Sequence, residues 1–203
     1  MTSHITYRQE VYRKLIHLSS LWMVAAIYVL DRPWALLLFG ILGVGVLCLE
    51  RVRRLDHPAG RILNRFFLNM MRTEERESTY RPTGAFFVLA GAFVSTLAFG
   101  QAVAMTALAM MLTGDIAAAL VGRRFGRIRI MDKSLEGTAA FFVTAFLFAV
   151  LISALVPVPD HFFRASAAGA LAGAIAELFA KKIKIDDNLV VPLAAGVVMS
   201  ILV

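Results

Sequence analysis

Gly114-Asp115 lies inside a long apolar run, which ends at Gly122-Arg123-Arg124-Phe125-Gly126. The next apolar run opens with Lys133-Ser134-Leu135-Glu136-Gly137-Thr138. A carboxylate placed in hydrocarbon costs about 2.5–3.5 kcal/mol even on lenient insertion scales. The arrangement therefore predicts apolar helices in a membrane, with an acid retained for its chemistry. It also predicts that carboxylates and guanidinium groups gather at one membrane face.

The composition is typical of an integral membrane protein. The chain has 203 residues, of which 59% are hydrophobic, and its mean hydropathy is +0.74. Soluble domains are nearer ~45–50% apolar. Its one cysteine, Cys48, cannot form an internal disulfide. The net charge of +7 does not indicate nucleic-acid binding, because the basic residues sit in loops between apolar segments and leave no basic soluble domain.

The apolar segments predict an all-α, polytopic membrane protein that forms a single domain over residues 1–203. Segments of about 17–25 apolar residues can cross a bilayer. We count seven, at about 13–30, 33–50, 82–99, 102–121, 137–156, 162–180 and 188–203. The first is interpreted as a retained helix rather than a secretory signal, because no convincing small-residue cleavage site follows it.

The distribution of basic residues predicts the orientation. With seven spans, all but two of the 21 Lys and Arg residues fall on one side of the membrane, the exceptions being Arg32 and Arg164. Cytoplasmic loops carry such an excess. We therefore expect the N-terminus and the polar clusters described below in the cytoplasm, and the C-terminus on the opposite side.

A cytoplasmic amphipathic helix is predicted at about 57–72, between the second and third spans. Its apolar residues recur at three- and four-residue spacing, namely Ala59, Ile62, Leu63, Phe66, Phe67, Met70 and Met71. Such a helix lies in the headgroup layer of the membrane. It serves either as an entrance for a lipid substrate or as a surface anchor, and the pattern does not separate the two.

Two polar clusters are expected where the first and fourth spans meet the cytoplasm. Glu10, Lys14 and His17 share one helix face at i, i+4 and i+7. Asp115 lies about two helical turns below Arg123 and Arg124. Intramembrane carboxylates are functional by default. The structural alternatives are an interfacial anchor for the first cluster and a buried ion pair for the second.

Two further clusters lie where the fifth and seventh spans begin. They comprise Asp132, Lys133, Ser134, Glu136 and Thr138, and then Asp186, Asp187 and Asn188, which Glu177 faces from the end of the sixth span. Two adjacent acids followed by an amide offer hard oxygen ligands of the kind that Mg²⁺ accepts. The structural alternatives are loop and helix-start chemistry at Gly137 and Thr138, a positive-inside charge at Lys133, and, for the second cluster, capping of exposed N–H groups at the helix start.

The motifs that are missing narrow the chemistry. The chain has no GxxxxGK[ST] loop, no Cys/His set spaced for zinc and no Gly-x-Ser-x-Gly elbow. An ion or proton path would place polar groups through the membrane depth, whereas these clusters lie at one face. One-sided clustering favours a water-soluble phosphate donor that meets a lipid-dissolved acceptor.

These motifs resemble those of the CTP-dependent lipid-alcohol kinases, which include dolichol kinase, phytol and farnesol kinase and the yeast-type diacylglycerol kinase. The resemblance rests on GD…GRRFG, KSLEGT and E…DDNLVVPL, and it extends to Arg13-Lys14-Leu15-Ile16-His17, Arg72-Thr73-Glu74-Glu75 and Thr83-Gly84. It implies transfer of the γ-phosphoryl group of CTP, with Mg²⁺ as cofactor, to the hydroxyl of a polyprenol, phytol or diacylglycerol in the bilayer.

Within that resemblance, each candidate residue has an expected role. The metal ligands are Asp115, Asp186 and Asp187, with Asp115, Glu136 and Asp187 expected to be catalytic. Either Asp115 or Glu136 would accept the alcohol proton. The groups expected to bind CTP are Arg123, Arg124, Lys133, Ser134, Thr138, Asn188, Lys14 and His17.

Two other functions remain open from the sequence. The kinases are similar to the CDP-diacylglycerol synthases, so a cytidylyltransferase that makes a CDP-lipid is the first alternative. A small transporter with Asp115 and Glu177 as relay acids is the second. The sequence does not name the alcohol or the oligomeric state.

Overall fold

The computed structural model describes residues 7–54, 60 and 82–203. Apart from residue 60, the predicted interfacial helix at about 57–72 lies outside the described residues. The helices are α1 (Tyr7–Ser19), α2 (Trp22–Val29), α3 (Arg32–Arg54), α6 (Gly84–Ala98), α7 (Gln101–Phe125), α8 (Leu135–Ser153), α9 (Phe162–Ile183) and α10 (Asp187–Leu202), and two short strands are β1 (Arg129–Ile130) and β2 (Lys133–Ser134).

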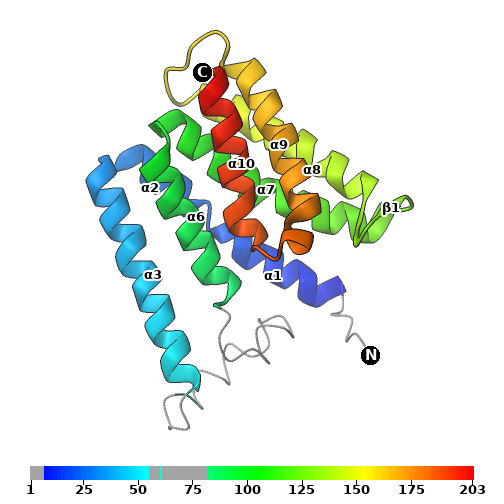
Figure 1. Ribbon diagram of the computed structural model, residues 1–203, viewed down its shortest axis with the longest axis horizontal. Coiled ribbons are helices and arrows are strands. Elements are labelled where there is room, and N and C mark those ends of the chain that lie inside the picture. The colour runs from blue at the N-terminus through cyan, green and yellow to red at the C-terminus, as the bar shows by residue number, and fades with distance from the viewer. Residues whose placement is uncertain (1–6, 55–59, 61–81) are drawn as a thin grey trace.

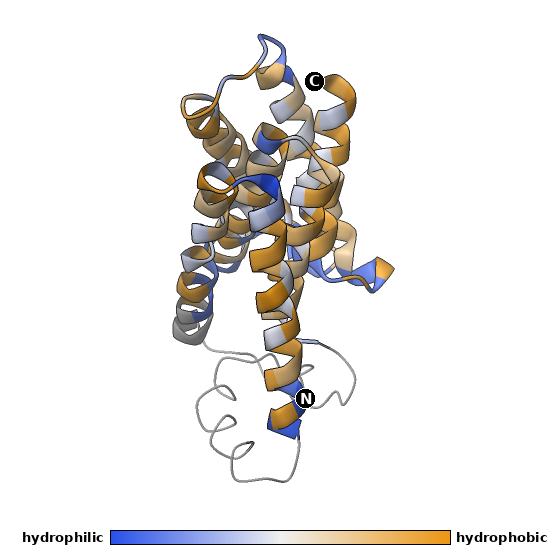
Figure 2. Ribbon diagram, turned by 90° about the vertical axis from the view of Figure 1, so that its left-hand side faces the viewer, coloured by the Kyte–Doolittle hydropathy of each residue, from blue (hydrophilic) through white to orange (hydrophobic). Residues whose placement is uncertain are grey.

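The structure confirms a helical fold with helices suited to a membrane. Four helices, α3, α7, α8 and α9, are long and apolar enough to cross a membrane, whereas α6 and α10 are apolar but shorter. Hydrophobic residues cover most of the length of the helices, and hydrophilic residues gather toward the helix ends (Figure 2). A total of seven spans stays a prediction.

The first predicted span is wrong as one continuous helix, because the chain breaks between α1 and α2. The Ser19 hydroxyl donates to the Ile16 carbonyl oxygen at 2.6 Å, and the Ser20 N–H donates to the His17 carbonyl at 3.0 Å. Serine hydroxyls compete in this way with the helical hydrogen-bond ladder. The break lets α1 cross the lower end of the bundle, where α10 begins (Figure 1).

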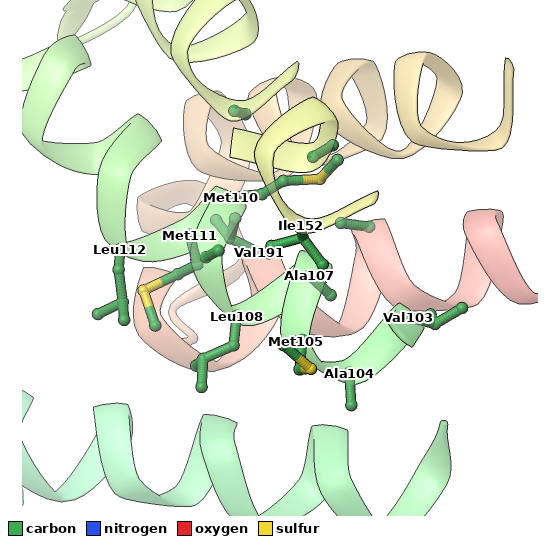
Figure 3. Packing of buried hydrophobic residues seen from close by; sticks show 14 of the residues in the cluster. Val103, Ala104, Met105, Ala107, Leu108, Met110, Met111, Leu112, Ile152 and Val191 are labelled. Carbon is green, nitrogen blue, oxygen red and sulfur yellow. The ribbon is translucent and has the colours of Figure 1, made fainter. Parts of the chain in front are cut away.

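Helix α7 is the central helix of the bundle. Of its apolar stretch 78% is buried, against 22% for α3. Ile152 of α8 and Val191 of α10 belong to the hydrophobic core around α7. The buried side chains of α7 point away from its axis on several sides (Figure 3). A helix that is apolar all round is typical of a bundle centre, so polar side chains in its buried stretch, such as Thr106 and Thr113, are held inside the protein.

Small residues let α7 and α8 approach closely, as expected for helices that pack in lipid. A Cβ on Gly114 would lie 2.7 Å from the Phe141 ring, and a Cβ on Gly137 would lie 2.8 Å from the Ala118 carbonyl oxygen. Gly114, Ala118 and Gly122, spaced four residues apart, thus form a contact face of α7 against α8. It places Asp115 beside the start of α8.

A short hairpin joins α7 to α8, and the sequence analysis did not predict it. Strands β1 and β2 pair antiparallel, with Arg129 opposite Ser134 and Ile130 opposite Lys133. The turn contains Met131 at a φ of 54°, in the left-handed region that few residues other than glycine adopt. The hairpin fixes where β2 presents Lys133.

Candidate functional site

A buried ion pair joins α1 to α7, the central helix. The Lys14 ammonium bonds to a carboxylate oxygen of Asp115, and only 4% of the Lys14 side chain and 13% of the Asp115 side chain are exposed. His17, one turn further along α1, places Nε2 at 3.6 Å from the same oxygen. The first two predicted clusters therefore meet at Asp115.

A second buried ion pair joins the hairpin to α9. The Lys133 ammonium bonds to a Glu177 carboxylate oxygen and also donates to the Glu177 backbone carbonyl at 2.8 Å. Glu177 continues the face of α9 that carries Gly169 and Gly173, and all three are buried. The pairing of Lys133 with Glu177 was not predicted from the sequence.

Asp187, at the start of α10, brings the two pairs into one site. Its carboxylate acts electrostatically on both His17 and Glu177, and the Asp115 carboxylate acts on the same two residues. We call the six residues the charged cluster, namely Lys14, His17, Asp115, Lys133, Glu177 and Asp187. The cluster draws on α1, α7, β2, α9 and α10. Figure 1 shows that α1 crosses the bundle where α10 begins.

The charged cluster holds polar atoms with unused bonding capacity. Within the described residues, Nε2 of His17 and Oε2 of Glu177 are buried and make no hydrogen bond. Buried polar atoms are nearly always hydrogen-bonded in folded proteins. An acceptor and a ring nitrogen left over in one buried site favour a polar ligand there.

A glycine on α6 helps to position the start of α10. A Cβ on Gly91 would lie 2.4 Å from the Asn188 backbone oxygen. Asn188 is itself buried, and its N–H and side-chain amide both donate to Asp186, at 3.1 and 2.7 Å. Asp186 is thus the N-cap of α10, as the structural alternative had it, while Asp187 sits one residue further on.

Ser134 and Thr138 also perform helix-start roles. The Ser134 hydroxyl accepts the Gly137 N–H at 3.1 Å, and the Thr138 hydroxyl donates to the Ser134 carbonyl at 3.2 Å. The Ser134 bond caps the start of α8, whereas the Thr138 hydroxyl bonds back to the preceding turn. Their roles in binding CTP stay predictions.

Glu136 and Arg124 lie in a different place, at a surface depression beside the hairpin. The depression has a volume of about 400 Å³ and is lined by Arg124, Phe125, Gly126, Arg127 and Glu136. The Glu136 carboxylate accepts the N–H groups of Arg127 and Ile128 at 2.9 and 3.2 Å. We call this surface depression the hairpin depression. Arg123, on the last turn of α7, is exposed.

The acids do not by themselves form a metal-binding group. In residues 7–54, 60 and 82–203, no three His, Cys, Asp or Glu side chains gather closely enough to hold a metal ion. Mg²⁺, however, is usually held by one or two carboxylates together with the phosphates of a substrate. Asp115 and Asp187 share one electrostatic neighbourhood, so this donor set fits Mg²⁺ bound with a nucleotide better than Mg²⁺ alone.

A polar contact beside this end of the bundle was also missed. Glu50, near the end of α3, accepts the Thr83 N–H at 2.9 Å and bonds to the Thr83 hydroxyl. Thr83 is the N-cap of α6. The position of Glu50 at the end of an apolar run could have indicated a functional or structural contact. Its partner Thr83, however, lies 33 residues further along the chain, so the sequence does not show the pairing.

Comparison with known proteins gives one relative of nearly full length. No family model matches the chain, and no solved structure matches it. The chain is 29% identical over 188 residues to an uncharacterized protein of Rickettsia prowazekii (strain Madrid E). The aligned region covers 91% of this chain and 90% of that protein. The similarity is therefore not confined to one motif.

Proposed function

We propose that the protein is a CTP-dependent kinase that transfers the γ-phosphoryl group to the hydroxyl of a membrane lipid alcohol. The observation that carries this proposal is the charged cluster. Its two buried ion pairs and Asp187 come from five separate elements and meet at one end of a bundle of apolar helices. The motif resemblance adds the nucleotide and the class of acceptor.

Phosphoryl transfer needs mainly positioning and neutralisation of charge, because its transition state is loose and highly anionic. Lys14 and Lys133 supply two ammonium groups, and His17 supplies a ring nitrogen that makes no hydrogen bond within the described residues. We expect these groups to bind phosphate oxygens. Mg²⁺ held by Asp115 and Asp187 would neutralise the polyphosphate when bound.

The proton acceptor follows from the same arrangement. The sequence left Asp115 and Glu136 as candidates. Glu136 already accepts two backbone N–H groups beside the hairpin depression, whereas Asp115 lies within the charged cluster. We therefore propose that Asp115 accepts the proton of the alcohol hydroxyl. The Lys14 ammonium would then move from Asp115 toward the phosphates when substrate binds.

The acceptor is expected to stay dissolved in the membrane. Four helices are long and apolar enough to cross it, and the charged cluster lies at the end of the bundle where α8 and α10 begin. A polyprenol, phytol or diacylglycerol would keep its chain among the helices and bring its hydroxyl to that end. We expect this end to face the cytoplasm, because most of the basic residues fall on that side of the predicted topology.

Position-specific labelling tests the proposal. The purified protein in proteoliposomes is given lipid alcohol, Mg²⁺ and CTP labelled in either the γ- or the α-phosphate, and the lipid phase is extracted and counted. We expect label in the lipid from γ-labelled CTP alone. Label from the α-phosphate with a lipid-phosphate acceptor would identify a cytidylyltransferase instead. No transfer to prenols, phytol or diacylglycerol would refute the kinase.

A further inference from the structure

We propose that the hairpin depression binds the phosphate of an anionic phospholipid and so anchors the β1–β2 hairpin to the membrane surface. The proposal concerns residues outside the charged cluster and does not depend on the kinase activity. It rests on the position of the hairpin, on its charge and on its exposed apolar side chains.

The hairpin lies where a lipid headgroup is within reach. It connects α7 to α8, and both helices are long and apolar enough to cross a membrane. A short connection between the ends of two spans emerges at the membrane surface. Hydrocarbon and headgroups are then both next to the ten residues from Phe125 to Ser134.

Arginines supply the charge that a phosphate needs. Arg124 and Arg127 line the depression and are exposed, and Arg129 on β1 is exposed as well. The Arg124 guanidinium lies over the Phe125 ring, 5.5 Å from its centroid, which orients its planar face. The Glu136 carboxylate also lines the depression and accepts backbone N–H groups of the loop, so the two arginines leave a net positive charge there.

Apolar side chains alternate with these arginines, and they favour a lipid over a soluble anion. Phe125 is 59% exposed, Ile128 56% and Met131 49%. Large apolar side chains grouped on a loop are unfavourable in water but suit the acyl boundary beneath the headgroups. A nucleotide or a free phosphate would use the arginines alone and leave these side chains in water.

The experiment measures binding of a short-chain phosphatidylglycerol to the full chain in phosphatidylcholine nanodiscs. We expect the double variant Arg124→Gln/Arg127→Gln to bind about 25-fold more weakly, at about fivefold for each arginine near an anionic surface. Arg164→Gln is the matched control, because Arg164 is also exposed but lies near the start of α9, at the other end of the bundle. This control should bind as the wild type does.

A second measurement tests the apolar part of the proposal. In a Cys48→Ser background, an environment-sensitive fluorophore on Phe125→Cys should shift to the blue when phosphatidylglycerol is added to phosphatidylcholine vesicles. The shift should be lost with the two arginine substitutions. Ile128→Ser should weaken lipid binding without changing the charge.

Two soluble competitors separate the sources of phosphate. Inorganic phosphate and CTP with Mg²⁺ should not displace the lipid from the hairpin. If either competes fully, or if Arg124→Gln/Arg127→Gln binds CTP weakly and the lipid normally, the depression is a nucleotide or anion site and the proposal is wrong. Unchanged lipid binding in the double variant would also refute it.

Discussion

The two ends of the bundle use the same helices in opposite ways. At the charged end, α1, α7 and α9 bury Lys14, Asp115 and Glu177, which bond to other side chains. At the other end, glycines of α9 and α10 let large apolar side chains approach: a Cβ on Gly169 would lie 2.5 Å from Met199, and one on Gly196 would lie 2.2 Å from Phe99.

Polar side chains at the apolar end bind the backbone instead. Gln101 donates to the Ile27 carbonyl at the end of α2 at 2.9 Å, and Arg32 donates to the Leu97 carbonyl near the end of α6. His161 bonds to the Val203 carbonyl at 2.9 Å. These contacts satisfy helix ends, which lack backbone partners.

The difference shows which end is built for stability. Packing of small against large side chains holds helices together in lipid. A buried ion pair contributes little, because desolvation of two charges offsets their attraction. A bundle that needed only to hold together would carry apolar packing at both ends, so the charged end is best explained by a ligand.

The largest effect expected concerns the second ion pair. Lys133→Met leaves the Glu177 carboxylate buried without its cation, which should destabilise the protein by about 3–5 kcal/mol. The double variant Lys133→Met/Glu177→Leu should recover most of this loss. Unfolding by denaturant in micelles measures both.

Lys181→Met is the control for that pair, because 69% of the Lys181 side chain is exposed and its partner Asp132 lies 4.0 Å away. It should change stability by less than about 1 kcal/mol. Equal losses in Lys133→Met and Lys181→Met would remove the contrast between buried and exposed charge.

Turnover should depend on the acids of the charged cluster. Asp115→Asn and Asp187→Asn should each lower the rate of lipid phosphorylation by about 100-fold or more, equivalent to about 2.7 kcal/mol in barrier. Asp132→Asn, at an acid that is 72% exposed, should keep its rate. Circular dichroism and elution volume check folding. Full turnover in either cluster variant would remove that acid from the site.

The apolar end should be sensitive to a single methyl group. In Gly196→Ala the new Cβ meets the Phe99 ring at 2.2 Å, and overpacking of this kind costs about 1–3 kcal/mol. In Gly45→Ala nothing lies within 4 Å of the new Cβ, so alanine's helix propensity should stabilise α3 by up to about 1 kcal/mol. Thermal unfolding in detergent compares the two variants, and a tolerated Gly196→Ala would mean that this end is loosely packed.

The smallest effect expected lies in the turn between α9 and α10. Lys184 ends α9 at a φ of 59° and a ψ of 24°, a left-handed conformation that costs a residue with a Cβ about 1 kcal/mol. Lys184→Gly should therefore raise the unfolding temperature slightly. A lowered temperature would show that the lysine side chain stabilises the end of α9 by more than its backbone conformation costs.

Much of the fold could be predicted from the sequence, because lipid demands long apolar helices and leaves polar residues conspicuous. Asp115 and Lys14 stood out for that reason, as did Glu177 and Asn188 at the ends of apolar segments.

The rest depended on tertiary contacts that no local pattern records. The break at Ser20 turns α1 across the bundle, and hydrophobicity alone does not show it. The partners Lys133 and Glu177 are 44 residues apart. The sequence placed Arg124 beside Asp115 and Glu136 beside Lys133. In the structure both Arg124 and Glu136 line the hairpin depression instead.

The bond between Lys14 and Asp115 has a consequence for biosynthesis, because 101 residues separate the two partners. The amine is translated and delivered to the membrane well before the acid that neutralises it. Before α7 is inserted, we expect α1 to lie at the lipid–water boundary, where the Lys14 ammonium group remains hydrated. Assembly of the amino-terminal segment is thus completed late, when the central helix is already in place to receive it.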